Sequence, residues 1–416
     1  MKKDIILLTH YFPFGKKESF LATEIEHIST AFEKVHIFNV GIQINKSEKR
    51  LIPKNCIIYN TNHRNSFKNR FTALYSLFSI HFYVELFYLV FIYKKTPNLN
   101  RIKTILISLR NSKAIKHSIE NQIDLSKSNL TIYSYWSDDN ATAIAMLAKK
   151  YPQHKYISRA HGWDLYFERS VCDYLAFKKL IIKYLDEIHF ISNDGLKYFR
   201  KKHNLPNQDK LFVSRLGVKG HLVEIDSFYK KDKPFTILSN SYIYPNKRVD
   251  LIAEVVSKLD GDINWCHIGD AAYDDEHFEK LKRFTERLLK DKKTINYTLL
   301  GGISNFDVTE ILKTNKIDLF VNLSLSEGIP VTFMEVMSFG IPVLATNVGG
   351  VNEIINQTNG VLIDKGLEAE RIAKIISEFW SKNEFEIQQY RVNAFNQWGN
   401  KYNADHNYLN FTKHII

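Results

Sequence analysis

The sequence predicts an α/β protein made of two doubly wound halves, each with its own parallel sheet. Its 416 residues are 44% hydrophobic, 25% charged and 13% aromatic, which excludes disorder for most of the chain and suffices for two or three cores. From residue 129 onward, short β-rich runs alternate with helical patterns, as crossover connections between parallel strands do. Strand and helix patterns alternate again after residue 234. Sheets of this kind bind ligands beyond the carboxyl ends of their strands.

The first strand is expected at residues 5–8, an apolar run that is too short for the hydrophobic region of a signal peptide. The stretch 212–232, with two glycines and several lysines, is the expected connection between the halves. Further strands are predicted at 130–135, 155–158 and 187–192 in the first half, and at 235–239, 263–268, 295–300, 318–322 and 343–346 in the second.

Charge and cysteine content limit the classes of protein. The net charge of +12 would suit nucleic acid, anionic lipid or a phosphorylated substrate. Cys56, Cys172 and Cys266 are odd in number and widely separated, which excludes a disulfide framework and paired zinc ligands. A reducing cytoplasm is the expected compartment.

Most of the charge lies in a basic, aromatic insert at residues 64–116. Between Thr61 and Glu120, ten lysines and arginines stand against two acidic residues. Residues 71–93 are apolar and long enough to span a bilayer, but polar residues interrupt them and their many tyrosines favour an interface. An interfacial helix pair, a core helix and a membrane span all remain open. The functional interpretation predicts that 64–116 contact an anionic membrane surface.

The most informative stretch is 318–350, where a strand leads through a Gly-Pro loop into a helix. Gly328 allows a ligand to approach the backbone closely, and Pro330 suits the first turn of a helix. Free amides around Val331 and Thr332 would favour a phosphate.

Two acidic residues, Glu327 and Glu335, flank this expected anion site. Because the amides already hold the phosphates, the carboxylates are predicted to accept hydrogen bonds from sugar or ribose hydroxyls. A capped helix with solvated acids would give the same pattern. Residues 347–353 show the same arrangement, in which two glycines follow the next strand and a helix then begins.

These residues resemble glycosyltransferase family 4, of which glutamates eight positions apart are a signature. The resemblance covers most of the chain and keeps the order of the family's motifs. The matching segments are 159–166, 191–195, 214–218, 247–251, 326–335 and 338–353, with Trp398, Asn407 and Tyr408 in the tail.

The resemblance implies a GT-B fold, in which two Rossmann-like domains face each other across a cleft, and sugar transfer that retains the anomeric configuration. It implies an acceptor-side domain at 1–217, a nucleotide-sugar domain at 218–390 and a helix at 391–416 that returns to the first domain. No metal is expected. The sequence Asp260-Gly-Asp262 is a literal Asp-x-Asp but falls at a helix-to-strand turn, so we interpret it as surface.

By the same resemblance, Glu335 holds the ribose, and Lys247 neutralises the diphosphate. Many relatives have an arginine where this chain has Ser241, so phosphate binding would depend more on Lys247, Arg248 and backbone amides. Glu327 and the backbone would face the sugar and phosphates; the donor-binding residues after it are Gly328, Ile329, Pro330, Val331 and Thr332.

In the first half, His161 matches the histidine that meets the donor sugar in relatives, and Asp164 follows it in the same motif. Gly15 and Glu18 lie in the loop after the first strand, where relatives approach phosphates and acceptor. A plain strand-to-helix turn capped by Glu18 or Ser19 fits that loop equally well.

The sequence thus predicts a cytoplasmic, metal-independent retaining hexosyltransferase, peripheral on the inner face of the cell membrane, that uses a nucleotide-diphosphate sugar and a lipid-linked or cell-surface polysaccharide acceptor. One alternative is a soluble family-4 enzyme acting on a protein or teichoic acid. A second is a nonenzymatic nucleotide-sugar or nucleic-acid binding module, because basic patches interleaved with aromatics can bind single strands. No nucleic acid is expected for the leading prediction.

Overall fold

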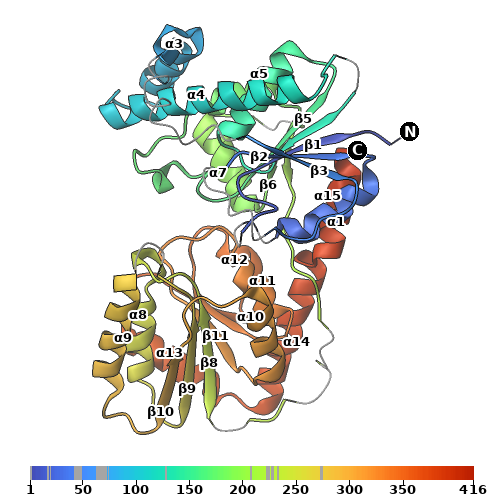
Figure 1. Cartoon of the computed structure of the whole chain (residues 1–416). Coiled ribbons are helices and arrows are strands. Elements are labelled where there is room, and N and C mark those ends of the chain that lie inside the picture. The colour runs from blue at the N-terminus through green and yellow to red at the C-terminus, as the bar shows by residue number, and fades with distance from the viewer. Residues whose placement is uncertain are drawn as a thin grey trace. The chain divides into compact units, whose positions relative to one another are not determined.

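The structure, a computed structural model, describes residues 2–15, 18, 20–41, 49–61, 73, 75–126, 129–206, 209–221, 225, 229–231, 234–271 and 275–416. The chain divides into two compact units (Figure 1). Unit 1 comprises Met1–Leu216 and Ala404–Ile416, and unit 2 comprises Gly217–Asn403. The chain therefore returns to unit 1 at Ala404 rather than at residue 391.

Unit 1 has a parallel sheet in the order β3-β2-β1-β4-β5-β6-β7 among its described residues. Its strands are β1 Ile5–Thr9, β2 Val35–Asn39, β3 Cys56–Asn60, β4 Thr131–Ser134, β5 Lys155–Ala160, β6 Glu187–Phe190 and β7 Leu211–Val213. Its helices are α1 Leu21–Ala31, α3 Ile80–Phe87, α4 Leu99–Gln122, α5 Asp139–Lys150, α6 Lys178–Tyr184, α7 Asn193–His203 and α15 Ala404–Ile415, with short turns η1 Tyr75–Phe78, η2 Tyr88–Ile92 and η3 Phe167–Arg169.

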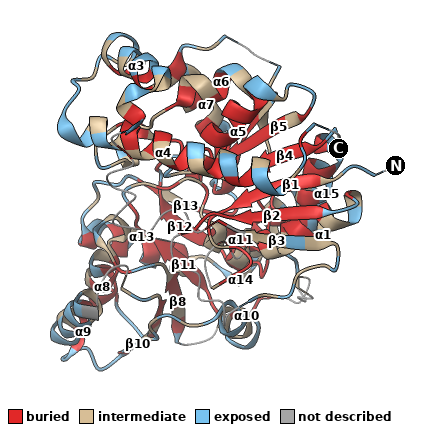
Figure 2. Ribbon diagram, turned by 45° about the horizontal axis from the view of Figure 1, so that its top comes forward, coloured by how far each residue is buried: buried red, intermediate tan, exposed pale blue. Residues whose placement is uncertain are grey.

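The central strands of this sheet are buried along almost their whole length (Figure 2). Alternate residues of β1 point into two different layers, as the pleat of a strand requires. Ile6 and Leu8 pack in the cluster that includes α5, α6 and α7, whereas Ile5 and Leu7 pack with α1 and α15. Because both faces of β1 are buried, its sequence is a continuous apolar run from Ile5 to Leu8.

A buried ion pair and its neighbours join four elements of unit 1, namely α1, β4, β5 and α15. Arg159 Nη1 of β5 lies 2.6 Å from Glu24 Oε2 of α1, and both side chains are fully buried. Tyr133 donates a hydrogen bond to Glu24 Oε1 at 3.2 Å. The guanidinium also lies 4.0 Å from the ring centre of Phe411 in α15, so the last helix packs on the same charge.

Unit 2 has a parallel sheet in the order β10-β9-β8-β11-β12-β13 among its described residues. Its strands are β8 Phe235–Asn240, β9 Ile263–Ile268, β10 Ile295–Leu299, β11 Leu319–Asn322, β12 Val343–Thr346 and β13 Gly360–Ile363. Its helices are α8 Val249–Ser257, α9 Asp275–Leu289, α10 Asn305–Thr314, α11 Val331–Met337, α12 Val351–Ile354, α13 Ala369–Ser381 and α14 Glu384–Lys401, with η4 Pro245–Lys247.

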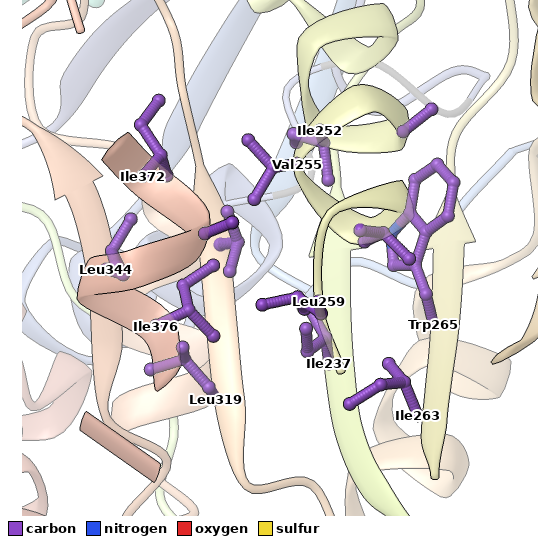
Figure 3. Close-up of a cluster of buried hydrophobic side chains, with 14 of the residues drawn as sticks. Ile237, Ile252, Val255, Leu259, Ile263, Trp265, Leu319, Leu344, Ile372 and Ile376 are labelled. Carbon is purple, nitrogen blue, oxygen red and sulfur yellow. The ribbon is translucent and has the colours of Figure 1, made fainter. Parts of the chain in front are cut away.

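The core of unit 2 is formed by strand residues packed under α8 and α13 (Figure 3). Ile237 and Leu319 of the sheet meet Ile252 of α8 and Ile376 of α13 in this cluster. Trp265 is also buried there, and its indole nitrogen donates to Ser239 Oγ at 2.9 Å, so the polar atom of this ring is paired. The packing fixes the sheet whose carboxyl edge carries the candidate donor site.

Candidate donor site and candidate acceptor site

A pocket of about 560 Å³ lies at the carboxyl edge of the sheet in unit 2. The loops that follow three neighbouring strands, β11, β12 and β13, line it. This is the edge at which parallel α/β sheets bind ligands. The lining residues are Leu325, Ser326, Asn347, Val348, Gly349, Asp364, Lys365 and Gly366.

Two of the loops touch backbone to backbone, and only glycine permits this approach. Gly349 has φ +54°, and a Cβ on it would lie 1.9 Å from the carbonyl oxygen of Glu327. A Cβ on Gly350 would lie 2.8 Å from the carbonyl oxygen of Gly328. The glycines after β12 therefore allow the Glu327–Gly328 backbone to pack directly against the next loop.

Helix α11 begins immediately after Pro330, which is its N-cap residue and provides no side-chain cap. Val331 and Thr332, in its first turn, are partly buried, while Ile329 is buried. Backbone amides at an uncapped helix start favour an anion. Because α11 has only seven residues, few peptide dipoles add to this effect.

Glu335 lies just over one turn into α11 and is partly buried. Among the described residues, its carboxylate has neither a hydrogen-bond donor nor an ion-pair partner. Burial alone raises the pKa of Glu335 to about 7. A desolvated carboxylate without a donor is suited to accept hydrogen bonds from hydroxyl groups of a ligand.

Lys247 and Glu327, both predicted from the sequence, form an ion pair with each other. The turn that carries Lys247 is fixed to the loop after β11, because Leu325 N donates to Asn246 O at 2.8 Å and the Asn246 side chain donates to Ser326 O at 3.1 Å. Lys247 therefore stands beside the loop after β11, and its ammonium is already neutralised by Glu327.

Arg248, predicted as a phosphate ligand, binds backbone carbonyls with two of its three nitrogens, and Nη2 has no hydrogen-bond partner among the described residues. Its Nε donates to Leu323 O at 2.5 Å and its Nη1 donates to Lys365 O at 2.7 Å. It thus ties the loop after β11 to the loop after β13, and so holds the pocket wall. Ser241, where relatives have an arginine, follows β8 and donates its backbone amide to Ile268 O at 3.0 Å.

In unit 1, His161 lies directly after β5 in a box of aromatic rings. Its ring centre is 4.4 Å from that of Trp136 and 4.7 Å from that of Tyr135. The side chain is buried, and within the described residues neither ring nitrogen has a hydrogen-bond partner. The nearest carboxylate oxygen, Asp164 Oδ2, is 3.6 Å from Nδ1, which is too long for a hydrogen bond.

Asp164 is occupied by the backbone around it. It accepts hydrogen bonds at 2.8 Å from the amides of His161 and Ser137. Buried Lys178 donates to the carbonyl oxygen of Asp164 at 2.6 Å, and burial lowers the pKa of Lys178 to about 8. Asp164 and Lys178 together fix the loop that carries His161.

Glu18 is occupied in a similar way. Its carboxylate accepts from the amides of His10, Tyr11 and Phe12 at 3.0, 2.7 and 2.6 Å, and from Trp136 Nε1 at 2.5 Å. It therefore shapes the loop after β1 instead of capping α1, whose N-cap residue is Phe20. Gly15, with φ +64°, has open space where a side chain would stand, and its carbonyl accepts from Arg50 at 2.6 Å.

One cluster of possible metal ligands occurs among the described residues. Glu187, His189 and His414 bring three ligand atoms within 4.8 Å of one another, on β6 and α15 of unit 1. Lys155 Nζ lies 3.1 Å from Glu187 in the same cluster, and this cation already compensates the carboxylate. Asp260 and Asp262 lie in the turn between α8 and β9, where Gly261 has φ +101°.

The basic aromatic insert forms a layer on unit 1, in which α3 packs on α4 and α4 on α5 (Figure 1). Phe82 and Leu89 face this layer, and buried Glu85 accepts from Tyr174 Oη at 2.5 Å and from Phe177 N at 2.6 Å. The predicted charges at 64, 68 and 70, and positions 71, 72 and 74 of the stretch 71–93, lie outside the described residues.

Large apolar side chains of this layer are also exposed. Within the part of the chain that the structure describes, the helices are too short or too polar to cross a bilayer. We call the exposed set the aromatic face; its members are Tyr75, Phe78, Ile80, Tyr83, Val84, Phe87, Phe91, Ile92 and Leu99.

Comparisons with known proteins agree with this architecture. Residues 223–396 match the family model described as glycosyl transferases group 1. An uncharacterised glycosyltransferase of Methanocaldococcus jannaschii is 26% identical over 67% of this chain and 72% of its own. The O-antigen biosynthesis glycosyltransferase WbnH of Escherichia coli is 26% identical over 55% of this chain and 62% of its own.

Solved structures agree on the fold. Anabaena HepE, crystallised with UDP and glucose, aligns with a TM-score of 0.65 at 13% identity, covering 100% of this chain and 99% of that one. The predicted GT-B fold is confirmed. The matched domain, the relatives and the shared fold together support a GT-B glycosyltransferase with a glycosyl transferases group 1 domain at residues 223–396.

Proposed function

We propose that this protein is a retaining glycosyltransferase that moves a hexose from a nucleotide-diphosphate sugar to a lipid-linked or cell-surface polysaccharide acceptor. One observation carries the proposal: the segment that matches the family model contains the pocket, the glycine-held loop and the unpaired carboxylate of Glu335. HepE was crystallised with UDP, so a UDP-sugar is the first donor to test.

In the proposed complex, Glu335 accepts hydrogen bonds from ribose hydroxyls, and the amides from Gly328 to Thr332 bind the diphosphate. Lys247 exchanges its partner Glu327 for the phosphates, which frees Glu327 to face the sugar. Arg248 contributes to donor binding by holding together the loops after β11 and β13 that line the pocket. These cationic and amide groups would stabilise the charge on the departing diphosphate without a metal.

In the proposed reaction, the bond between the anomeric carbon and the phosphate oxygen breaks, and the acceptor oxygen bonds to that carbon on the same face. The acceptor proton passes to the departing phosphate oxygen. His161, whose ring nitrogens have no partner within the described residues, would bond a hydroxyl of the donor sugar. Chemistry on one face gives retention.

A lysine substitution tests the donor site. We expect Lys247→Ala to weaken binding of UDP-glucose, or of the donor found by a thermal-shift screen of UDP-, GDP- and ADP-sugars, by about 10- to 100-fold, because it removes a charged hydrogen bond. Isothermal titration calorimetry measures the effect. Lys258→Ala is the control, since Lys258 is exposed directly after α8 and pairs with surface Glu370. Unchanged affinity in Lys247→Ala would refute the assignment.

The acceptor part of the proposal places the enzyme on the inner face of the cell membrane. WbnH acts in O-antigen biosynthesis, and the aromatic face offers an apolar surface of interfacial character. Ile80, Val84, Phe87 and Phe91 recur at helical spacing along it. Exposed lysines follow in sequence, including Lys94 and Lys103, and their charge suits anionic lipid.

Vesicle binding tests this placement. We expect the protein to co-sediment with vesicles containing phosphatidylglycerol, and Phe87→Glu/Phe91→Glu to reduce the bound fraction at least about tenfold, because two exposed rings that would enter the lipid interface are lost. Phe306→Glu/Phe385→Glu is the matched control, since these rings are exposed in unit 2. Equal binding by the two double variants, or no binding by the wild type, would favour a soluble enzyme acting on a protein or teichoic acid.

A further inference from the structure

Three neighbouring strands of unit 1 end beside one another and are each followed by aromatic or imidazole side chains. The strands β1, β4 and β5 are adjacent in the sheet. His10 follows β1, Trp136 follows β4 by two residues, and Trp163 follows β5 by three. All lie at the carboxyl edge, where the loops of a parallel sheet meet ligands.

Trp163 is the outermost ring of this group. Its ring centre is 5.2 Å from that of Trp136 and 5.9 Å from that of His10. Although it rests on two other rings, Trp163 is 47% exposed. A large aromatic side chain that is supported on one side and open on the other provides a flat contact surface.

The support beneath Trp163 is rigid. The indole nitrogen of Trp136 donates to Glu18, and Glu18 also accepts from the backbone amides after β1. His10 Nε2 lies 2.6 Å from Asp138 Oδ2, which fixes the imidazole ring. The carboxylate of Glu18, predicted from the sequence to face the acceptor, therefore acts by positioning the rings.

A polar group next to this support lacks a partner. His161 is 6% exposed and its ring contacts Trp136, yet within the described residues neither of its nitrogens has a hydrogen-bond partner. A buried imidazole without partners is costly, and a hydroxyl-rich ligand would satisfy it. His161, proposed above to bond a hydroxyl of the donor sugar, thus lies on the same loop as the exposed ring of Trp163, so a saccharide on Trp163 would lie beside the sugar to be transferred.

We infer that this aromatic group is a saccharide-binding platform for the acceptor, with Trp163 as the ring on which a sugar stacks. A pyranose presents an apolar face of C–H groups to an indole and directs its hydroxyls outward, toward polar groups at the rim. The inference rests on the proposed function, because it names the chemical class that the unit 1 site accepts. Trp163 is a binding residue for the acceptor and takes no part in donor binding.

The test uses soluble octyl glycosides of glucose, galactose and N-acetylglucosamine, below the concentration at which they form micelles. We expect at least one to change the intrinsic tryptophan fluorescence of the wild type and to accelerate UDP release from UDP-glucose. Trp163→Ala should abolish the fluorescence change and raise the KM for that glycoside about tenfold, with kcat within a factor of about two. Trp163→Phe should restore KM to within about threefold.

Two controls separate the platform from a structural role and from the proposed function. Phe385→Ala removes an exposed ring of unit 2 and should leave every value unchanged. The donor site has its own readouts in the wild type, namely the affinity for UDP-glucose and its slow hydrolysis by water. Loss of donor hydrolysis in the wild type would refute the transferase, whereas the fluorescence response to glycosides would still report on the platform.

Three results would overturn the inference. The first is no fluorescence response of the wild type to any of the glycosides. The second is an unchanged KM in Trp163→Ala, or a fall in kcat that Trp163→Phe does not restore. The third is a response to uridine monophosphate that Trp163→Ala abolishes, because the ring would then stack on a nucleobase.

Discussion

Glu335→Gln is expected to weaken donor binding by about 10- to 100-fold while making the protein more stable above neutral pH. The carboxylate is the proposed acceptor of ribose hydroxyls, and hydrogen bonds to a charged group contribute about 1.5–3 kcal/mol. In the free protein, burial without a partner raises its pKa to about 7, so the charged form is destabilising there. Glutamine removes that charge.

The pH dependence follows from the direction of this shift. Between about pH 4.5 and 7, folded Glu335 keeps a proton that it loses on unfolding, so stability falls as the pH rises through this window. The free energy of unfolding of Glu335→Gln should therefore equal that of the wild type near pH 4.5 and exceed it by about 1–2 kcal/mol at pH 8. Denaturant unfolding at the two pH values measures this.

Donor affinity should have the opposite dependence on pH. Ribose hydroxyls that donate to the carboxylate lower its pKa in the complex, so binding releases a proton below pH 7 and strengthens as the pH approaches 7. Calorimetry of the wild type should show this slope, and Glu335→Gln should lack it. Glu370→Gln, on the surface of α13, is the control. Parallel pH profiles for wild type and Glu335→Gln would contradict the assignment.

Glu24→Gln is expected to lower the free energy of unfolding of unit 1 by about 3–5 kcal/mol, since it leaves Arg159 as an uncompensated charge in the core. Both side chains are fully buried, and Arg159 Nε and Nη2 have no hydrogen-bond partner among the described residues. Urea denaturation followed by circular dichroism measures the change.

The double variant Glu24→Leu/Arg159→Met provides a second readout. It removes both charges, so its stability should lie within about 2 kcal/mol of the wild type, far above that of Glu24→Gln. Glu26→Gln, exposed on the same helix, should change stability by no more than about 0.5 kcal/mol. A loss below about 1 kcal/mol in Glu24→Gln would mean that the pair contributes little.

Much of the fold could be predicted because buried parallel strands are unbroken apolar runs. The strands expected at 235–239, 263–268 and 343–346 are found as β8, β9 and β12. Four strands were missed. β2 contains His36 and Asn39, β3 ends at Asn60, β7 has only three residues and β13 begins at Gly360, so their sequences resemble loops. Their burial comes from neighbours in the sheet, which local sequence does not encode.

The site was predictable in residue type but less so in side-chain direction. Lys247 and Glu327 lie together as the motif suggested, whereas Arg248, Glu18 and Asp164 are occupied by backbone groups. Such bonds depend on loop shape, which a motif does not specify. Asp364 and Lys365 of the pocket were missed; their position directly after a strand was the available signal.

The division of unit 1 between the two ends of the chain has a consequence for biosynthesis. Phe411 and Ile415 of α15 belong to the same core as β1 and α1, and the whole of unit 2 is translated between them. On the ribosome, unit 2 is continuous and can fold as soon as it has been translated. Unit 1 keeps part of its apolar core exposed until α15 has been synthesised. Chaperone demand should therefore be greatest late in translation, and any lesion in α15 should act as a folding defect rather than a local one.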